Sequence, residues 1–454
     1  MAGSRKPCPA DPEAAVRACL GRHRIAAGRI CVALSGGVDS VVLLHALQRC
    51  CRGGAIALSA CHVDHGLSPE AGRWADFCAE LCARLSVPCT LRRVHVEVAG
   101  QGLEAAARTA RMAALAAQPA DFLAFAHHAD DQAETLLYRL LRGTGLRGAA
   151  AMAELAPRPG GAALLRPLLA LRRADIEAWA RGRGLRWIED ESNQVADFDR
   201  NYIRNELMPG MRRRFPAVAE RLASAAENFR EGEALLDRLA AIDWQALGGG
   251  DVSAPDGALA GLEAARLRNL LRWRIRHLGG RPPGRARLLE AARQLGEAAV
   301  ERPLCIDLGD AELCRYRGHF WLQPAARAEP MSLEWHGEER LDWGGGEMVF
   351  ARRAGGGLSP RALDGRVTVS PRRDGDRLRP RAGGPSRDFK SLAQEAGVPP
   401  WMRARLPVLR VDGRPCWAAE LGIEAAAACA AGEIGLVPSW RAPAGVVTRL
   451  RETP

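Results

Sequence analysis

The sequence lacks the features that mark membrane and secreted proteins. It has no apolar run near the roughly 18 residues that a membrane span requires. Its first residues, MAGSRKPCPADPEAA, contain no apolar stretch of the signal-peptide kind. The 13 cysteines are scattered without one CxxC pair, whereas disulfide frameworks are typical of short secreted chains. We therefore expect a cytoplasmic protein with reduced cysteines and no membrane partner. Cys78 and Cys82 stand one helical turn apart, but no second pair completes a metal site, and none is predicted.

Lysine is also nearly absent, although the chain is basic. The net charge is +11 at pH 7, and only Lys6 and Lys390 are lysines, so the positive charge comes from arginine. Arginine recognises phosphates through two parallel hydrogen bonds and stacks on bases, which favours a nucleic-acid partner. The same composition would arise if arginine replaced lysine at ordinary solvent-exposed positions. Composition alone leaves both interpretations open.

The length of 454 residues suggests about three domains. Short apolar runs at 29–34, 56–63, 89–98 and 121–128 each precede a segment of helical periodicity. This alternation predicts an α/β domain with a parallel, doubly wound sheet over residues 1–215. Residues 216–340 carry helical spacing and predict a helical domain. Residues 341–454 combine short strand patterns with turns and predict a small α+β domain.

A glycine loop stands where the first predicted strand meets its helix. Its residues are Ser35, Gly36, Gly37, Val38, Asp39 and Ser40. Backbone N–H groups and the helix dipole converge there, so the loop predicts an anion site with hydroxyl donors at Ser35 and Ser40. A carboxylate beside phosphates is repulsive unless a cation bridges them, so Asp39 indicates Mg²⁺. The simpler alternative is a glycine turn with capping Ser and Asp.

The loop lacks the GK[ST] of the Walker pattern. SGGVDS resembles instead the loop of the pyrophosphatase-type ATP enzymes, which transfer AMP to an oxygen of their substrate. This resemblance implies that the chain binds ATP and adenylates a substrate.

Two further runs fall at ends of predicted strands and should share one sheet edge with the loop. HVDHGLSPE begins at His62, and AHHADDQAET begins at Ala126. The second run puts Asp130 and Asp131 at a helix N-terminus, with Glu134 one turn later. Capping alone could account for one acid; three acids beside a phosphate loop favour a cation-dependent or amine-binding site. Arg108 and Arg111 lie three apart on another predicted helix, where a solvent-exposed face is the alternative.

The motifs together resemble the tRNA(Ile)-lysidine synthetase family. They are, in order, SGGVDS, HVDHGL, LEAAAR-x-x-R, AHHADDQAET, RGTGL, RPLL, RWIEDESNQ, DRNYIRNELMP, PRRDGDRLRP and FKSLAQEAGVPPWMRARLPVL. The resemblance covers most of the chain. It departs at Met112, where the family commonly has Tyr, and at Ser68, where Arg often follows HGL.

The resemblance implies a fold of the adenine nucleotide alpha hydrolase type and a specific reaction. That reaction uses ATP to attach L-lysine to C2 of the wobble cytidine in the CAU anticodon of an isoleucine tRNA, which changes decoding from AUG to AUA. Residues 35–40 and His62 would hold ATP, Asp39 would bind Mg²⁺, and Arg111 would support adenyl transfer. Asp131 and Glu134 would lie in the catalytic pocket and receive the lysine ammonium.

The resemblance also implies tRNA-facing residues, which combine cations with amides. They are Arg108, Arg200, Asn201, Arg204, Arg372, Arg373, Lys390 and Arg403. Trp401 stands beside the last of these; it could stack on a base, but we favour a core position. A homodimer is one assembly that the sequence leaves open.

Three other functions explain the sequence less completely. A tRNA thiolation enzyme of the same loop family usually needs paired cysteines, and CxxC is absent. A nonenzymatic RNA-binding protein would explain the charge but not the acids near the loop. A small-molecule amidating synthetase would leave the basic C-terminal region unexplained.

Overall fold

The computed structural model describes residues 11–66, 68–96, 103–158, 160–189, 199–250, 253–297, 302–325 and 331–450. The chain forms two compact units, Met1–Ala234 and Leu235–Pro454. The division between them falls within the long helix α10 (Val218–Ala246). The predicted division into three domains, at 215/216 and 340/341, stays a prediction.

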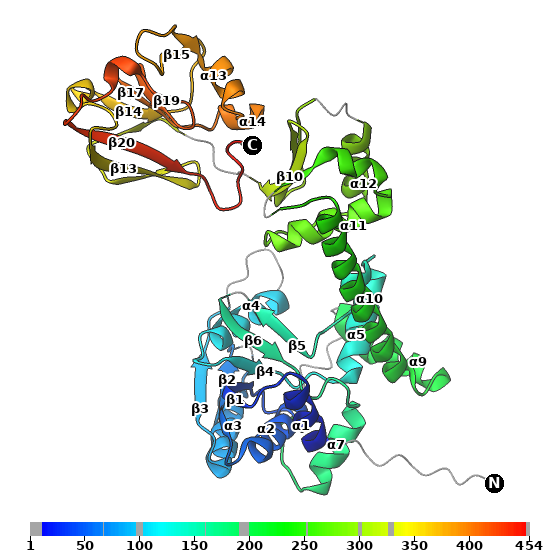
Figure 1. Ribbon diagram of the computed structural model, residues 1–454. Coiled ribbons are helices and arrows are strands. Elements are labelled where there is room, and N and C mark those ends of the chain that lie inside the picture. Colours follow the sequence, from blue (N-terminus) through cyan, green and yellow to red (C-terminus); the bar gives the residue numbers. More distant parts are fainter. Residues whose placement is uncertain are drawn as a thin grey trace. The chain divides into compact units, whose positions relative to one another are not determined.

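The first unit is built on a six-stranded sheet with the order β3-β2-β1-β4-β6-β5 (Figure 1). Its strands are β1 (Ala27–Ala33), β2 (Ala55–Asp64), β3 (Cys89–Arg93), β4 (Phe122–Ala124), β5 (Leu155–Arg158) and β6 (Gly161–Leu165). All neighbours pair in parallel except β5, which is antiparallel to β6. The predicted parallel sheet is thus confirmed. The strand order reverses between β1 and β4, and in open α/β sheets ligands bind outside the strand ends at such a point.

Helices cover both faces of this sheet (Figure 1). The longer helices are α1 (Pro12–Arg22), α2 (Val38–Cys51), α3 (Ala71–Leu85), α4 (Leu103–Ala116), α5 (Ala129–Leu141) and α7 (Arg173–Gly182). Because successive strand side chains point to opposite faces, Ile30 and Val32 of β1 pack in the core formed with α1, α2, α3 and α7. Cys31 packs on the other face, where Leu115 of α4 lies. The unit continues through α6 (Leu146–Ala149), α8 (Asp199–Tyr202), a π-helical turn (Ile203–Leu207) and α9 (Met208–Arg214).

The second unit begins with helices, as predicted, and also contains an antiparallel sheet that the sequence had not indicated. Its helices are a 3₁₀ segment (Asp256–Gly261), α11 (Ala264–His277) and α12 (Arg285–Glu297). Its strands, in the order β7-β10-β9-β8, are β7 (Ser253–Pro255), β8 (Leu304–Asp307), β9 (Ala311–Tyr316) and β10 (His319–Pro324). One core joins α11, α12 and the end of α10 to this sheet.

The last part of the second unit is the predicted α+β region. A five-stranded sheet consists of β11 (Leu333–Glu334), β14 (Val367–Ser370), β17 (Val408–Val411), β18 (Arg414–Ala418) and β19 (Gly422–Ile423). A three-stranded sheet consists of β12 (Arg340–Trp343), β13 (Gly346–Ala354) and β20 (Ile434–Arg441). The short elements are β15 (Arg377–Leu378), β16 (Arg387–Asp388), α13 (Phe389–Glu395), α14 (Pro400–Arg403) and 3₁₀ turns at Pro360–Leu363 and Ala425–Ala427. In the described part of the chain, no helix has both the length and the apolar character needed to span a membrane.

Candidate active site

The glycine loop connects β1 to α2, with Gly37 as the N-cap of the helix. The Ser40 hydroxyl accepts hydrogen bonds from the backbone N–H groups of Ser35 (3.3 Å) and Gly36 (3.2 Å) and donates to the Gly37 carbonyl (3.0 Å). The Ser40 hydroxyl therefore stabilises the conformation of the loop, whereas Ser35 is exposed on the surface of the loop. Since the first N–H groups of a helix have no intrahelical acceptor, the start of α2 can bind an anion.

Gly36 is the loop position that no other residue fits. Its φ is +90°, and a Cβ added there would lie 2.6 Å from Cδ1 of Ile188 and 3.3 Å from Sγ of Cys78. The Gly36 carbonyl also accepts a hydrogen bond of 2.9 Å from the Ile188 N–H. The segment around Ile188 thus packs directly on the phosphate loop.

We expect Gly36→Ala to raise the KM for ATP by about 10- to 100-fold, because backbone strain of ~1–3 kcal/mol adds to the collision with Ile188. Gly53→Ala is the matched control. Gly53 also has a positive φ, +74°, but open space surrounds its Cβ position. Steady-state kinetics in ATP separates the two variants, and equal KM values would show that the loop tolerates a side chain at Gly36.

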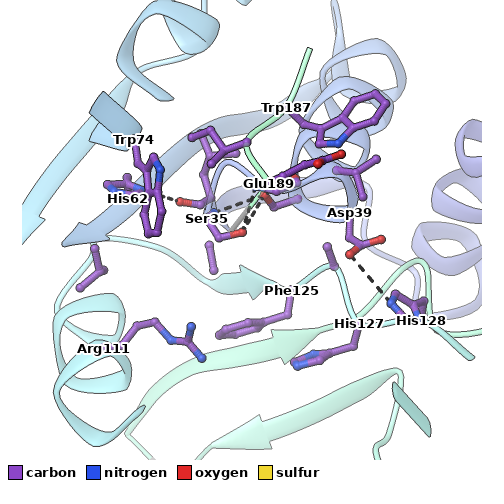
Figure 2. A pocket seen from close by; sticks show the side chains of 18 of the residues that line it. Ser35, Asp39, His62, Trp74, Arg111, Phe125, His127, His128, Trp187 and Glu189 are labelled. Carbon is purple, nitrogen blue, oxygen red and sulfur yellow. Dashed lines mark hydrogen bonds and ion pairs between the residues drawn. The ribbon is translucent and has the colours of Figure 1, made fainter. Parts of the chain in front are cut away.

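His62 lies at the end of β2 and is 5% exposed. Its Nδ1 is 2.9 Å from the Leu34 carbonyl oxygen, which cannot donate, so Nδ1 carries the proton and donates. Burial lowers the pKa of His62. A neutral ring therefore lines the cavity beside Trp74 (Figure 2), where it can contact a nucleotide.

The carboxylate of Asp39 has few hydrogen-bond or charge partners among the described residues. Its Oδ1 is buried and has no hydrogen-bond partner among the described residues, and Nε2 of His128 lies 3.9 Å from Oδ2 (Figure 2). Burial raises the pKa of Asp39, although His128 and Arg173 oppose the shift. A bound cation would supply the missing partner, so this side chain fits the predicted Mg²⁺.

The three acids of α5 divide into two groups. Asp130 accepts a hydrogen bond of 2.8 Å from the Arg173 N–H and pairs with Arg212, so it joins α5 to α7 and α9. Asp131 lines the cavity, and Glu134 is buried one turn further along. Burial alone would raise the pKa of Asp131, but nearby histidines and arginines, His128 first, lower it.

Arg204, from the π-helical turn, binds both of these acids. Its Nε and one terminal nitrogen lie 2.9 Å and 2.8 Å from the two carboxylate oxygens of Glu134, and the same terminal nitrogen is 2.9 Å from Asp131 Oδ1. Arg200 lies further out, 3.7 Å from Asp131. Arg204 lines the cavity but Glu134 does not. The predicted lysine-binding acids are therefore held by an arginine that the sequence had suggested for tRNA.

The site is a cavity of about 650 Å³. It brings together the phosphate loop, His62, Arg111 and Asp131, as predicted. His127 and His128 of the AHHADDQAET run also line it. The cavity adds residues that the sequence did not indicate as site residues, among them Trp74, Phe125, Trp187 and Glu189 (Figure 2). Arg173, Glu177 and Arg181 of α7 line it as well. Burial lowers the pKa of His127 well below its ordinary value, so its ring is neutral. Trp187 and Glu189 belong to the RWIEDESNQ motif, of which residues 190–194 lie outside the described residues.

Half of the eight residues predicted to face tRNA are exposed. Arg108, Arg372, Arg373 and Lys390 are exposed. Arg403 is half-buried and donates to the Val398 carbonyl. Asn201 is half-buried in α8. Trp401 packs against Trp321 and Tyr316, with ring centroids 5.9 Å and 6.3 Å apart, so the preference for a core position is confirmed.

Comparison with known proteins decides the family. A model of the PP-loop domain matches residues 14–211, one of the TilS substrate binding domain matches 257–321, and one of the TilS substrate C-terminal domain matches 367–440. A protein from Azoarcus sp. named tRNA(Ile)-lysidine synthase is 50% identical over 91% of this chain and 92% of its own length. The chain belongs to the tRNA(Ile)-lysidine synthase family. A protein of the same name from Aromatoleum aromaticum is 48% identical over 91% of this chain and 97% of its own.

Membership of the tRNA(Ile)-lysidine synthase family confirms the resemblance that the sequence motifs carry. The PP-loop domain model spans the six-stranded sheet and its cavity, which supports the use of ATP there. The two substrate domain models fall in the second unit. The match over nine-tenths of the chain also favours this family over the thiolation enzymes.

Proposed function

We propose that this chain ligates L-lysine to C2 of the wobble cytidine in the CAU anticodon of an isoleucine tRNA, through an adenylated tRNA intermediate. ATP is cleaved to AMP and pyrophosphate in the process. The observation that carries this proposal is one cavity that contains the phosphate loop, a poorly satisfied carboxylate and an acid-arginine cluster, in a chain of the lysidine synthase family. Cytoplasmic location and a homodimer stay predictions.

In the first step the cytosine C2 oxygen attacks the α-phosphorus of ATP, and pyrophosphate leaves. The start of α2 and the loop N–H groups bind the phosphates, and Arg111 on the cavity wall stabilises the charge that develops during transfer. Mg²⁺ held by Asp39 would screen the polyphosphate charge. The C2 oxygen is a poor leaving group, and adenylation makes it a good one.

In the second step a lysine amine attacks C2 and AMP departs. Asp131 and Glu134 are the acids that attract the lysine ammonium to the cavity. Arg204 now supplies their positive partner, and removing one partner from a buried ion pair is strongly destabilising. A lysine ammonium therefore replaces one of the Arg204 contacts, and each acid keeps a positive partner throughout.

The exposed arginines of the second unit bind tRNA phosphates in this proposal. We expect the double variant Arg372→Ala and Arg373→Ala to weaken tRNA binding and to make the slope of log K against log salt shallower by about one for each phosphate-binding arginine removed. The matched control is Arg340→Ala with Arg366→Ala, since these exposed arginines pair with Glu347 and Glu334. Filter binding over a salt series would refute the assignment if both double variants behaved alike.

An exchange assay with labelled pyrophosphate tests which substrate is activated. The proposal expects label to enter ATP only when the CAU isoleucine tRNA is present, with no need for lysine, because the adenylate forms on the tRNA. Exchange that depends on lysine and proceeds without tRNA would mean that the amino acid is activated instead, and it would refute the proposal.

A further inference from the structure

Two cysteines and a glutamate meet on one face of the antiparallel sheet in the second unit, far in sequence from the PP-loop domain. Cys305 of β8 is paired in register with Cys314 of β9. Glu312 precedes Cys314 by two positions, so its side chain points to the same face of the strand. The two sulfur atoms are 3.6 Å apart, and one ligand atom from each of the three residues lies within 4.8 Å of the others.

The sulfur separation matches that of a metal-bound pair. Two Zn–S bonds of ~2.3 Å at a tetrahedral angle put the sulfur atoms about 3.8 Å apart, whereas a disulfide requires about 2.05 Å. The two strands therefore already hold the thiols at the spacing of zinc ligands, and no backbone movement is needed. Cys305 is exposed, which gives a metal ion access, and Cys314 is buried.

The third ligand is oriented by a buried hydrogen bond. Nε2 of Gln323, a fully buried side chain, donates to Glu312 at 2.9 Å. Gln323 is itself fixed, since its Oε1 accepts from the Trp321 indole N–H at 3.0 Å. Such second-layer contacts are what orient carboxylate ligands in metal sites. Glu312 is thus held toward the two thiols by the interior of the sheet.

The charges around the site also balance. Two thiolates and one carboxylate carry −3, and Zn²⁺ leaves −1. The guanidinium of Arg405 lies 3.7 Å from Glu312 and supplies the remaining positive charge.

We propose that Cys305, Glu312 and Cys314 form a binding site for a thiophilic divalent cation such as Zn²⁺, with water as the fourth ligand. Binding displaces the two thiol protons, joins β8 to β9 and makes no use of the PP-loop cavity. Oxidation of the two thiols to a disulfide is a different chemistry, which a mild oxidant would reveal.

The test uses the full chain, reduced, loaded with Zn²⁺ and desalted, with retained zinc measured by mass spectrometry. We expect one equivalent in the parent protein and loss of that equivalent in Cys305→Ser, whose exposed side chain makes misfolding a minor concern. Glu312→Gln should retain both thiols and bind more weakly. Cys429→Ser is the control, because this half-buried cysteine belongs to no described cluster of metal-binding side chains.

Cobalt supplies a second readout that does not depend on enzymatic activity. Co²⁺ added to the parent protein should produce a thiolate-to-cobalt charge-transfer band that Cys305→Ser lacks and Cys429→Ser keeps. Equal zinc retention in the parent and Cys305→Ser proteins would overturn the proposal. A parent protein that retains no zinc, but whose Cys305 and Cys314 become linked by a mild oxidant, would overturn it in favour of a redox pair.

Discussion

Replacing Asp39 with Asn should lower the rate of AMP formation by at least about 100-fold, the scale of losing one preorganised charge contact at a transferring phosphoryl group. Asn keeps the shape of the side chain but offers only one weak oxygen ligand to Mg²⁺. The affinity for tRNA should remain close to that of the parent protein, because the predicted tRNA-facing residues are unchanged. AMP release by chromatography and tRNA binding by filter assay measure the two effects.

The same variant should be more stable than the parent protein when Mg²⁺ is absent. Burial raises the pKa of Asp39, so its folded-state pKa lies above the unfolded value and the ionised form destabilises the folded state. This penalty is present above the folded-state pKa and disappears as the pH falls below both values. Thermal unfolding at neutral pH should therefore show a higher midpoint for Asp39→Asn, and the difference should shrink in acid.

For the catalytic prediction, loss of tRNA binding with AMP formation retained in Asp39→Asn would contradict the role of Asp39 in holding the metal.

Replacing Asp131 with Asn should raise the KM for lysine by about 10- to 100-fold, since a hydrogen bond to a charged group contributes ~1.5–3 kcal/mol. The KM for ATP should change little, because Asp131 is proposed to meet the ammonium and not the phosphates. The lysine dependence of lysidine formation, measured at saturating ATP and tRNA, tests this. A normal KM for lysine in Asp131→Asn would mean that the ammonium binds elsewhere.

Asp130→Asn is the matched control for this experiment. Asp130 is the preceding residue on α5 and is similarly buried, but its partners are the Arg173 N–H and Arg212. The variant can weaken the packing of α5 against α7 and α9, which calorimetry would register. It should leave the KM for lysine near the parent value, so a selective effect at Asp131 would identify the carboxylate that binds lysine.

The elements of the first unit were predictable because its strands read as short apolar runs followed by helical periods. The apolar run at 29–34 falls in β1 (Ala27–Ala33), and the helical period that follows the run at 89–98 is α4 (Leu103–Ala116). The four-stranded sheet β7-β10-β9-β8 of the second unit was not predicted. Its strand β9 is buried at four consecutive positions from Leu313 to Tyr316, so the alternation that marks a half-exposed strand is missing there.

Site residues could be predicted where they belong to one local sequence motif. They could not be predicted where their position depends on contacts between residues far apart in the sequence. SGGVDS at a strand-helix junction indicated an anion site, and the structure brings Asp131 to the same cavity. The resemblance assigned Arg200 and Arg204 to a tRNA-facing surface, because no sequence pattern shows that Arg204 turns toward Glu134, 70 positions away. The packing of Ile188 on Gly36 is a long-range contact of the same kind.

Lysine ligation to tRNA is tested most directly by incubating the purified protein with ATP, Mg²⁺, radiolabelled lysine and the isoleucine tRNA that carries the CAU anticodon. We predict that label enters the tRNA in a linkage at the wobble cytidine, with one AMP and one pyrophosphate formed for each lysine joined. The closely related methionine tRNA with the same anticodon should accept far less. Sulfur transfer to tRNA, or AMP formation with no lysine joined to the CAU isoleucine tRNA, would contradict the proposed function.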